Sequence, residues 1–265
     1  MEARKSSSAR GWLVTLVGML AAVAIAINMF KVPPTMGLLM ADLGIGPALG
    51  GWLMTVPTVT GLVLALPSGG LTDKFGPKKV GLFAILSAAV GSLIGSFAPN
   101  IELLLFSRFV EGLSFALIGV AVPAIIALWF SPEKSGAPMA IWSGWVPIGM
   151  LAIFTGANLF IAADDPGTWA NVWWLSTALL VAAAVLYLVF VKAPEGYAAE
   201  DAPKISLVEG MKSPSTWLLA VVFAMFAFIM YAVSTFAPTY CMEELGYSLE
   251  DSNLYSSLIT VGMIL

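Results

Sequence analysis

Long runs of uncharged, mostly apolar residues alternate with short polar segments along the chain. The runs cover residues 11–30, 43–72, 80–101, 112–132, 135–163, 166–191, 213–242 and 252–265. A helix needs about 20 apolar residues to cross the hydrocarbon core of a bilayer. Seven runs are long enough and the last is too short, so the pattern predicts an all-α integral membrane protein with seven spans and the start of an eighth.

Composition agrees with this pattern. Hydrophobic residues make up 59% of the chain and charged residues 11%, whereas soluble domains are about 25% charged. The first run follows Arg4, Lys5 and Arg10 as a signal peptide would, but it exceeds a typical signal-peptide core and many spans follow. We therefore interpret it as a retained helix. The expected surroundings are membrane lipid.

The few reactive residue types limit the chemistry. With one cysteine, Cys241, the chain cannot form an internal disulfide, and with no histidine it lacks the commonest metal ligand and neutral-pH proton relay. We expect no metal and no cofactor other than a coupling ion, and proton chemistry would fall to carboxylates. Basic residues are too few for nucleic-acid binding, and no nucleophile–base arrangement indicates an enzyme.

Basic residues predict the orientation of the spans. If the N-terminus is cytoplasmic and the spans alternate, ten of the 12 Lys and Arg residues fall inside. The predicted outer loops carry none, which is the positive-inside pattern. We expect a multi-pass protein of the cell's inner membrane. The ten residues are Arg4, Lys5, Arg10, Lys74, Lys78, Lys79, Lys134, Lys192, Lys204 and Lys212.

A polar stretch divides the chain. Residues 1–191 hold six predicted spans, and 192–213 contain prolines, glycine and charges that indicate a cytoplasmic linker. Residues 214–265 hold the seventh span and the start of the eighth. The sequence thus predicts a six-helix unit, a linker and the beginning of a second unit.

A charged turn between the second and third runs carries the most specific motif. Its spacing, Gly-x-Leu-x-Asp-Lys-x-Gly-x-Lys-Lys, closely resembles the cytoplasmic loop signature of the major facilitator superfamily of secondary transporters. The resemblance implies a bundle that latches shut on its cytoplasmic side in one state; the alternative is a solvated basic loop without a gating role. The motif residues are Gly69, Asp73, Lys74, Gly76, Lys78 and Lys79.

The layout resembles the same superfamily, whose two six-helix halves are related by an axis along the membrane normal. The resemblance covers essentially the whole chain, while the chain supplies roughly two thirds of the helices. It implies a C-terminal half that is missing from this sequence. The alternative is a genuine eight-span protein, whose last helix would leave carbonyls unpaired in lipid.

The predicted fourth span contains Arg108 and Glu111 directly before the apolar run 112–132, three residues apart and hence on one helix face. Charges inside a membrane are rare and usually face a cavity or each other. The segment resembles the family's fourth-helix motif Arg-x-x-Gln-Gly, whose arginine is associated with substrate or proton coupling; here glutamate replaces glutamine. Two roles stay open: a coupling site with a titratable Glu111, or a static intrahelical ion pair.

The predicted first span contains Asn28 and Lys31, followed by two prolines that bend or break a helix. If the helix continues past the prolines, Lys31 lies deep in the membrane; if it ends there, Lys31 extends to the surface. Two buried cations, Lys31 and Arg108, would suit a small anion. Residues 28–39 and 53–60 look faintly like the cyanate-type branch of the superfamily.

Aromatic residues complete the candidate site. Trp142 and Trp145 in the fifth run and Tyr231 in the seventh are expected to line a cavity or to pack helices together. The sequence predicts a secondary transporter that moves a small solute, expected to be a small anion, by alternating access, with a proton as the candidate coupling ion. The alternatives are a non-transporting membrane sensor and an inactive truncated product on the same fold.

Overall fold

The computed structural model describes residues 9–194 and 212–264. Arg4, Lys5, Lys204 and most of the predicted linker lie outside the described residues. The described chain is helical, with one isolated bridge between Ala162 and Asp165. The all-α prediction is confirmed. The helices are α1 Ala9–Met29, α2 Val32–Leu43, α3 Pro47–Phe75, α4 Pro77–Ser96, α5 Ile101–Trp129, α6 Gly136–Ser143, α7 Trp145–Gly156, α8 Trp169–Phe190, α10 Pro214–Glu243 and α11 Leu249–Ile264, with single 3₁₀ turns η2 Pro132–Lys134, η3 Ala157–Leu159 and η4 Pro166–Thr168.

Seven described segments are long and apolar enough to cross a membrane, as the sequence pattern predicts. The first, Ala9–Leu43, joins α1 and α2, and the fifth, Gly136–Leu159, joins α6, α7 and η3. Both contain a break that hydropathy does not reveal. The helix α11 has 16 residues and falls below the length of a span.

Proline and glycine fix the helix boundaries. Prolines occupy the first turn of α2, α3, α4 and α10, where a residue's N–H has no partner within its own helix. The turn between α3 and α4 depends on Gly76, which has φ +82°, a conformation that favours glycine. At α5, the side chain of Asn100 accepts a hydrogen bond from Leu103 N at 3.0 Å.

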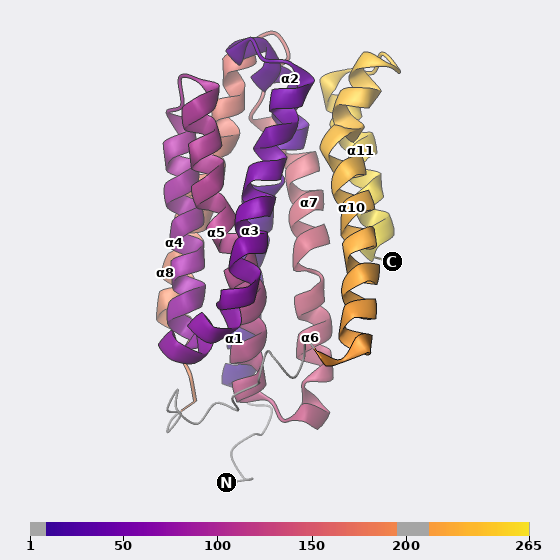
Figure 1. The fold of residues 1–265 in the computed structure, drawn as a ribbon. Helices are drawn as coiled ribbons and strands as arrows, with labels where there is room; N and C mark the ends of the chain where they lie inside the picture. Colours follow the sequence, from indigo (N-terminus) through magenta and orange to yellow (C-terminus); the bar gives the residue numbers. More distant parts are fainter. Residues whose placement is uncertain (1–8, 195–211, 265) are drawn as a thin grey trace.

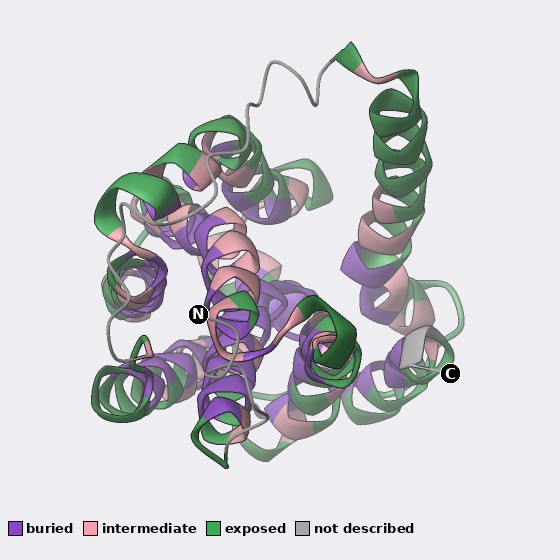
Figure 2. Ribbon diagram, turned by 90° about the horizontal axis from the view of Figure 1, so that it is seen from below, coloured by how far each residue is buried: buried purple, intermediate pink, exposed green. Residues whose placement is uncertain are grey.

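The helices stand side by side as a bundle (Figure 1). The long helix α5 packs against α1, α3 and α4, while α8 packs against α1 and α4. Outward-facing positions remain apolar, as expected for lipid contact, and Figure 2 shows these exposed faces around the bundle. The helix α10 is exposed along most of its length, and its buried residues, Ser234, Thr235, Pro238 and Thr239, lie in its C-terminal third.

Close approach of α3 and α5 depends on Gly112. A Cβ at this position would lie 2.6 Å from Cα of Pro57 and 2.7 Å from Cβ of Thr60. We expect Gly112→Ala to lower the free energy of unfolding by about 1–3 kcal/mol, because the two backbones would have to separate. Equilibrium unfolding in mixed micelles of a mild detergent and dodecyl sulfate measures the change.

Gly119, on the same helix, is the matched control for this substitution. A Cβ there meets nothing within 4 Å. We expect Gly119→Ala to be neutral or to stabilise the protein by up to about 1 kcal/mol, since alanine favours helix more than glycine does. Equal losses for the two variants would contradict the close packing of α3 on α5.

Candidate functional site

Lys31 lies at the break between α1 and α2, and its side chain is fully buried. The candidate span continues through the prolines to Leu43, and neighbouring helices enclose Lys31, so its side chain does not extend to the protein surface. Its Nζ donates to Asn28 Oδ1 at 2.7 Å, Ser92 Oγ at 2.9 Å and Glu111 Oε1 at 2.8 Å. These acceptors use all three ammonium protons. The Lys31 ammonium also lies 4.3 Å from the ring centroid of Trp173.

Arg108 is equally buried and is held mainly by backbone oxygens. Its Nε donates to the carbonyl of Leu53 at 2.8 Å and its Nη2 to that of Met29 at 2.8 Å. Its Nη1 donates to the carbonyl of Asn28 at 3.1 Å and to Glu111 Oε2. The guanidinium therefore joins α1, α3 and its own helix.

Prolines explain why those carbonyls are available. In a continuous helix a carbonyl accepts from the N–H four residues later. The residue four after Leu53 is Pro57, and the one four after Met29 is Pro33; neither has an N–H. An unpaired carbonyl in lipid costs on the order of several kcal/mol. Arg108 donates to these two carbonyls in place of the N–H groups that the prolines lack.

Glu111 links the two cations. One carboxylate oxygen accepts from Lys31 and the other from Arg108, and the side chain is 1% exposed. We call Asn28, Lys31, Arg108 and Glu111 the buried charge cluster. With all three ionisable groups charged, it carries two positive charges and one negative. The surplus positive charge is unusual, because buried charges are normally paired.

Sequence reasoning missed two neighbours of this cluster. Ser92 accepts from Lys31 and donates from its own Oγ to the carbonyl of Trp173 at 2.9 Å, which connects the cluster to α4 and α8. Trp173 also lies beneath the Lys31 ammonium. A serine and a tryptophan inside apolar runs carry little signal, whereas the prolines four residues after Met29 and Leu53 were visible in the sequence.

The predicted aromatic residues divide into two groups. Tyr231 on α10 packs against Phe30, with ring centroids 5.3 Å apart, and so lies next to the break that holds Lys31. Trp142 and Trp145 stack on each other at 5.4 Å, and Trp145 contacts Phe115 at 4.9 Å. Among the described interactions, no hydrogen bond joins either tryptophan to the buried charge cluster.

The loop motif lies at the α3–α4 turn, at the lower end of the bundle in Figure 1. Lys78 Nζ donates to the carbonyl of Leu188 at 3.0 Å, which ties the turn to the end of α8, and Lys74 lies 5.3 Å from the Phe75 ring. Asp73 and Lys79 are exposed. In the described part of the chain Asp73 has no ion-pair partner, and a Cβ at Gly69 would meet nothing within 4 Å.

Nothing in the described residues forms a group of three or more His, Cys, Asp or Glu side chains that would hold a metal ion. Glu111 already accepts from two cations. The arrangement offers buried charges and hydrogen-bonding groups, with one carboxylate between two cations.

The chain is similar to several transporters. From Bacillus subtilis, the "Putative niacin/nicotinamide transporter NiaP" is 24% identical over 224 residues, covering 80% of this chain and 54% of that protein. The galactose-proton symporter of Escherichia coli strain K12 is 28% identical over 163 residues, covering 59% of this chain and 34% of that protein. The chain thus spans about half, or less, of these relatives' lengths.

Structural comparison agrees. A bacterial homolog to the human lysosomal transporter Spinster, in an inward-facing and unoccupied conformation, superposes with a TM-score of 0.78 over 96% of this chain and 60% of that one. At 16% identity, this likeness shows the fold. The family model of the Major Facilitator Superfamily matches residues 16–265. With nearly the whole chain matched and the fold shared, the chain belongs to the Major Facilitator Superfamily.

Proposed function

We propose that the protein is a secondary transporter that moves a small monovalent anion together with a proton by alternating access. The observation that carries the proposal is the buried charge cluster, in which two cations share one carboxylate. Charged side chains at membrane depth mark substrate and ion pathways in transporters. The names of the relatives, which include a proton symporter, support the transport class.

The surplus charge favours an anion as the solute. A monovalent anion beside Lys31 would bring the cluster to neutrality, and burial in a low dielectric makes such pairing strong. Arg108 is committed to the carbonyls of Leu53, Met29 and Asn28. Lys31 has only side-chain acceptors, and its ammonium can turn without unpairing backbone. We therefore assign anion binding to Lys31 and a positioning role to Arg108.

Glu111 supplies the link to the proton. Protonation of its carboxylate would leave two positive charges buried together, which is unfavourable. A bound anion offsets one of them, so the anion favours proton binding and the proton favours anion binding by the same factor. Asn28 would keep its hydrogen bond with the Lys31 ammonium while Glu111, the charged partner of Lys31, gains or loses its proton.

We infer that the described conformation is closed at one end, because α10 contacts α2 and α11 contacts α7. On α11, Asn253 donates to the carbonyl of Pro34 at 3.3 Å and to Asn158 Oδ1 at 2.7 Å. Tyr231 covers Phe30 from α10, whereas the N-terminal two thirds of α10 is exposed. If the N-terminus is cytoplasmic in the inner membrane, as the basic residues predict, the closed end is the outer one and Tyr231 forms part of the barrier.

The loop motif fits a cytoplasmic latch in this scheme. Gly76 provides the turn and Lys78 ties it to α8. Asp73, Lys74 and Lys79 remain exposed at that end, and the exposed Asp73 would gain an ion-pair partner when the cytoplasmic side closes. Gly69 belongs to the motif by resemblance alone. A non-transporting membrane sensor on the same fold is the second candidate, and it would bind the anion without moving it.

Nicotinate and nicotinamide provide a matched pair of probes, because they share a ring and nearly the same size while only nicotinate is an anion. The relative NiaP makes this pair a reasonable first choice. In proteoliposomes with an imposed inward proton gradient, we expect uptake of nicotinate but not nicotinamide, above that of protein-free liposomes. Binding without uptake would favour the sensor, and no preference between the probes would contradict the anion assignment.

Lys31→Met tests the assigned role directly. We expect nicotinate uptake to fall about tenfold or more, equivalent to the loss of about 1.4 kcal/mol of anion binding. Folding should persist, because Arg108 and Glu111 remain paired. Lys79→Met, which removes an exposed lysine outside the cluster, is the matched control and should transport normally. Equal uptake by both variants would refute the role of Lys31.

A further inference from the structure

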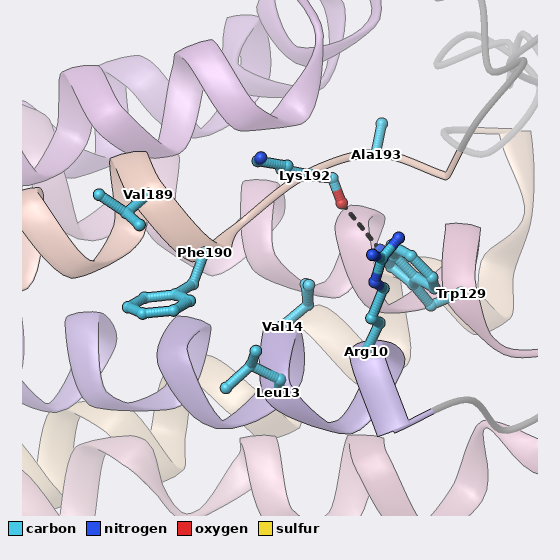
Figure 3. A pocket seen from close by; sticks show the side chains of 8 residues that line it. All are labelled: Arg10, Leu13, Val14, Trp129, Val189, Phe190, Lys192 and Ala193. Carbon is cyan, nitrogen blue, oxygen red and sulfur yellow. Dashed lines mark hydrogen bonds between the residues drawn. The ribbon is translucent and has the colours of Figure 1, made fainter.

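A second site lies at the opposite end of α1 from the buried charge cluster. A pocket of about 420 Å³ opens between the start of α1, the end of α5 and the segment after α8. Its volume falls within the range of about 300–1,000 Å³ typical of small-molecule sites. Figure 3 shows the eight side chains that line it: Arg10, Leu13, Val14, Trp129, Val189, Phe190, Lys192 and Ala193.

Two basic side chains and several apolar ones line the pocket. Arg10 and Lys192 are exposed, and within the described residues neither has an ion-pair partner. The lining residues described here include no carboxylate. In Figure 3 Arg10 lies on the side of Trp129, while the Lys192 side chain extends toward Val189 and Phe190. An anionic group would therefore meet two cations that have no ion-pair partner among the residues of the described segments.

The apolar wall points to a ligand with a hydrocarbon part. Leu13 is 42% exposed, Val189 51% and Phe190 43%, so these side chains form an outward-facing surface beside the cations. All three lie in membrane-spanning segments, where the neighbouring solvent is lipid. A single lipid could therefore place an acyl chain on this apolar surface while its headgroup contacts the cations.

Trp129 marks the boundary between the two environments. It ends α5, and its Nε1 donates to the carbonyl of Lys192 at 2.9 Å (Figure 3). Tryptophan is enriched where membrane spans meet the headgroup region, and basic pockets between spans bind anionic headgroups there. The hydrogen bond fixes the segment that carries Lys192 against α5.

We propose that this pocket binds one anionic phospholipid, with its phosphate between Arg10 and Lys192 and an acyl chain along Leu13, Val189 and Phe190. The site is separate from the buried charge cluster, and the proposal does not depend on transport. Its competing explanation is that the two cations only offset the negative ends of the α5 and α8 dipoles. A free phosphate compound is the other source of the same chemistry.

The test is lipid binding by the purified full chain in a neutral detergent, followed by native mass spectrometry. Phosphatidylglycerol and phosphatidylcholine with identical acyl chains are the probes. We expect wild type to prefer phosphatidylglycerol by at least about tenfold. A basic residue near a membrane surface contributes about 1 kcal/mol, so Arg10→Gln with Lys192→Gln should weaken phosphatidylglycerol binding about 30-fold and leave phosphatidylcholine binding unchanged.

Two controls make the result specific. Lys134→Gln removes an exposed basic residue of η2, which follows α5 at the same end of the bundle but lies outside the pocket; it should keep the preference. Arg10→Lys with Lys192→Arg keeps the charges and should also keep it. Loss of the phosphatidylglycerol preference in Lys134→Gln would overturn the proposal. It would also be overturned if the double glutamine variant lost stability but kept its lipid preference. Displacement of the lipid by glycerol phosphate would assign the site to free phosphates instead.

Discussion

Glu111→Gln is expected to cause the largest loss of stability of any single substitution in the buried charge cluster. The change leaves Lys31 and Arg108 buried with no counter-ion. In addition, the carboxylate oxygens of Glu111 now accept from both cations, and glutamine would put its N–H₂ group, itself a donor, against one of them. Breaking a buried pair in this way costs about 3–5 kcal/mol. Unfolding in mixed dodecyl sulfate micelles, followed by far-UV circular dichroism, measures it.

Adding Lys31→Met to this variant should recover part of the loss. The double variant carries one buried cation where Glu111→Gln carries two. Lys31→Met alone leaves the Arg108–Glu111 pair balanced, and we expect it to cost only about 1–2 kcal/mol, mainly because Asn28 and Ser92 lose a donor. If the double variant lost as much free energy of unfolding as the two single variants together, the two positions would be independent. The account in which Lys31 and Arg108 share the Glu111 carboxylate would then be contradicted.

Arg108→Lys is expected to destabilise the protein although it keeps the charge. Lysine cannot reach the carbonyls of Leu53 and Met29 with the fixed fork of a guanidinium. Each carbonyl left unpaired costs about 1–3 kcal/mol, so losing both partners should cost at least about 2 kcal/mol in the same unfolding measurement. A smaller loss would show that the positive charge of Arg108 matters and that its hydrogen bonds to the carbonyls do not.

Proline substitutions isolate the cause of this effect. Pro57→Ala supplies the N–H that Leu53 lacks, so in the Arg108→Lys background it should recover about 1 kcal/mol more than in wild type. Pro67→Ala is the matched control, because Pro67 is also inside α3 but lies four residues after Val63, which Arg108 does not contact. Equal coupling of both prolines to position 108 would contradict the role assigned to the guanidinium.

Much of the fold could be predicted from the chain because lipid imposes simple demands. Backbone groups must pair within each segment, so run length alone predicted seven spans. Local rules also predicted the break near Pro33 and the turn at Gly76. Hydropathy did not reveal the division of the fifth span at Gly144, because both α6 and α7 are apolar.

Contacts within the site could be predicted only between residues that are close in sequence, although Lys31 was already a candidate site residue. Arg108 and Glu111 lie three apart on one helix, so their pairing followed from helix geometry. Lys31 contacts Glu111 across 80 residues, and that contact depends on how α1 packs on α5. The spacing also left the two roles of the pair open. The stacking of Trp142 on Trp145, and the contact of Trp145 with Phe115, depend on packing that periodicity does not encode.

The most direct test of the account is the number of protons taken up when the anion binds. Isothermal titration of nicotinate into the protein in nanodiscs, in buffers of different ionisation enthalpy, gives this number, with nicotinamide as the neutral control. The account predicts about one proton per bound nicotinate, because an anion beside Lys31 allows Glu111 to become protonated. Nicotinate binding with no proton uptake would contradict it.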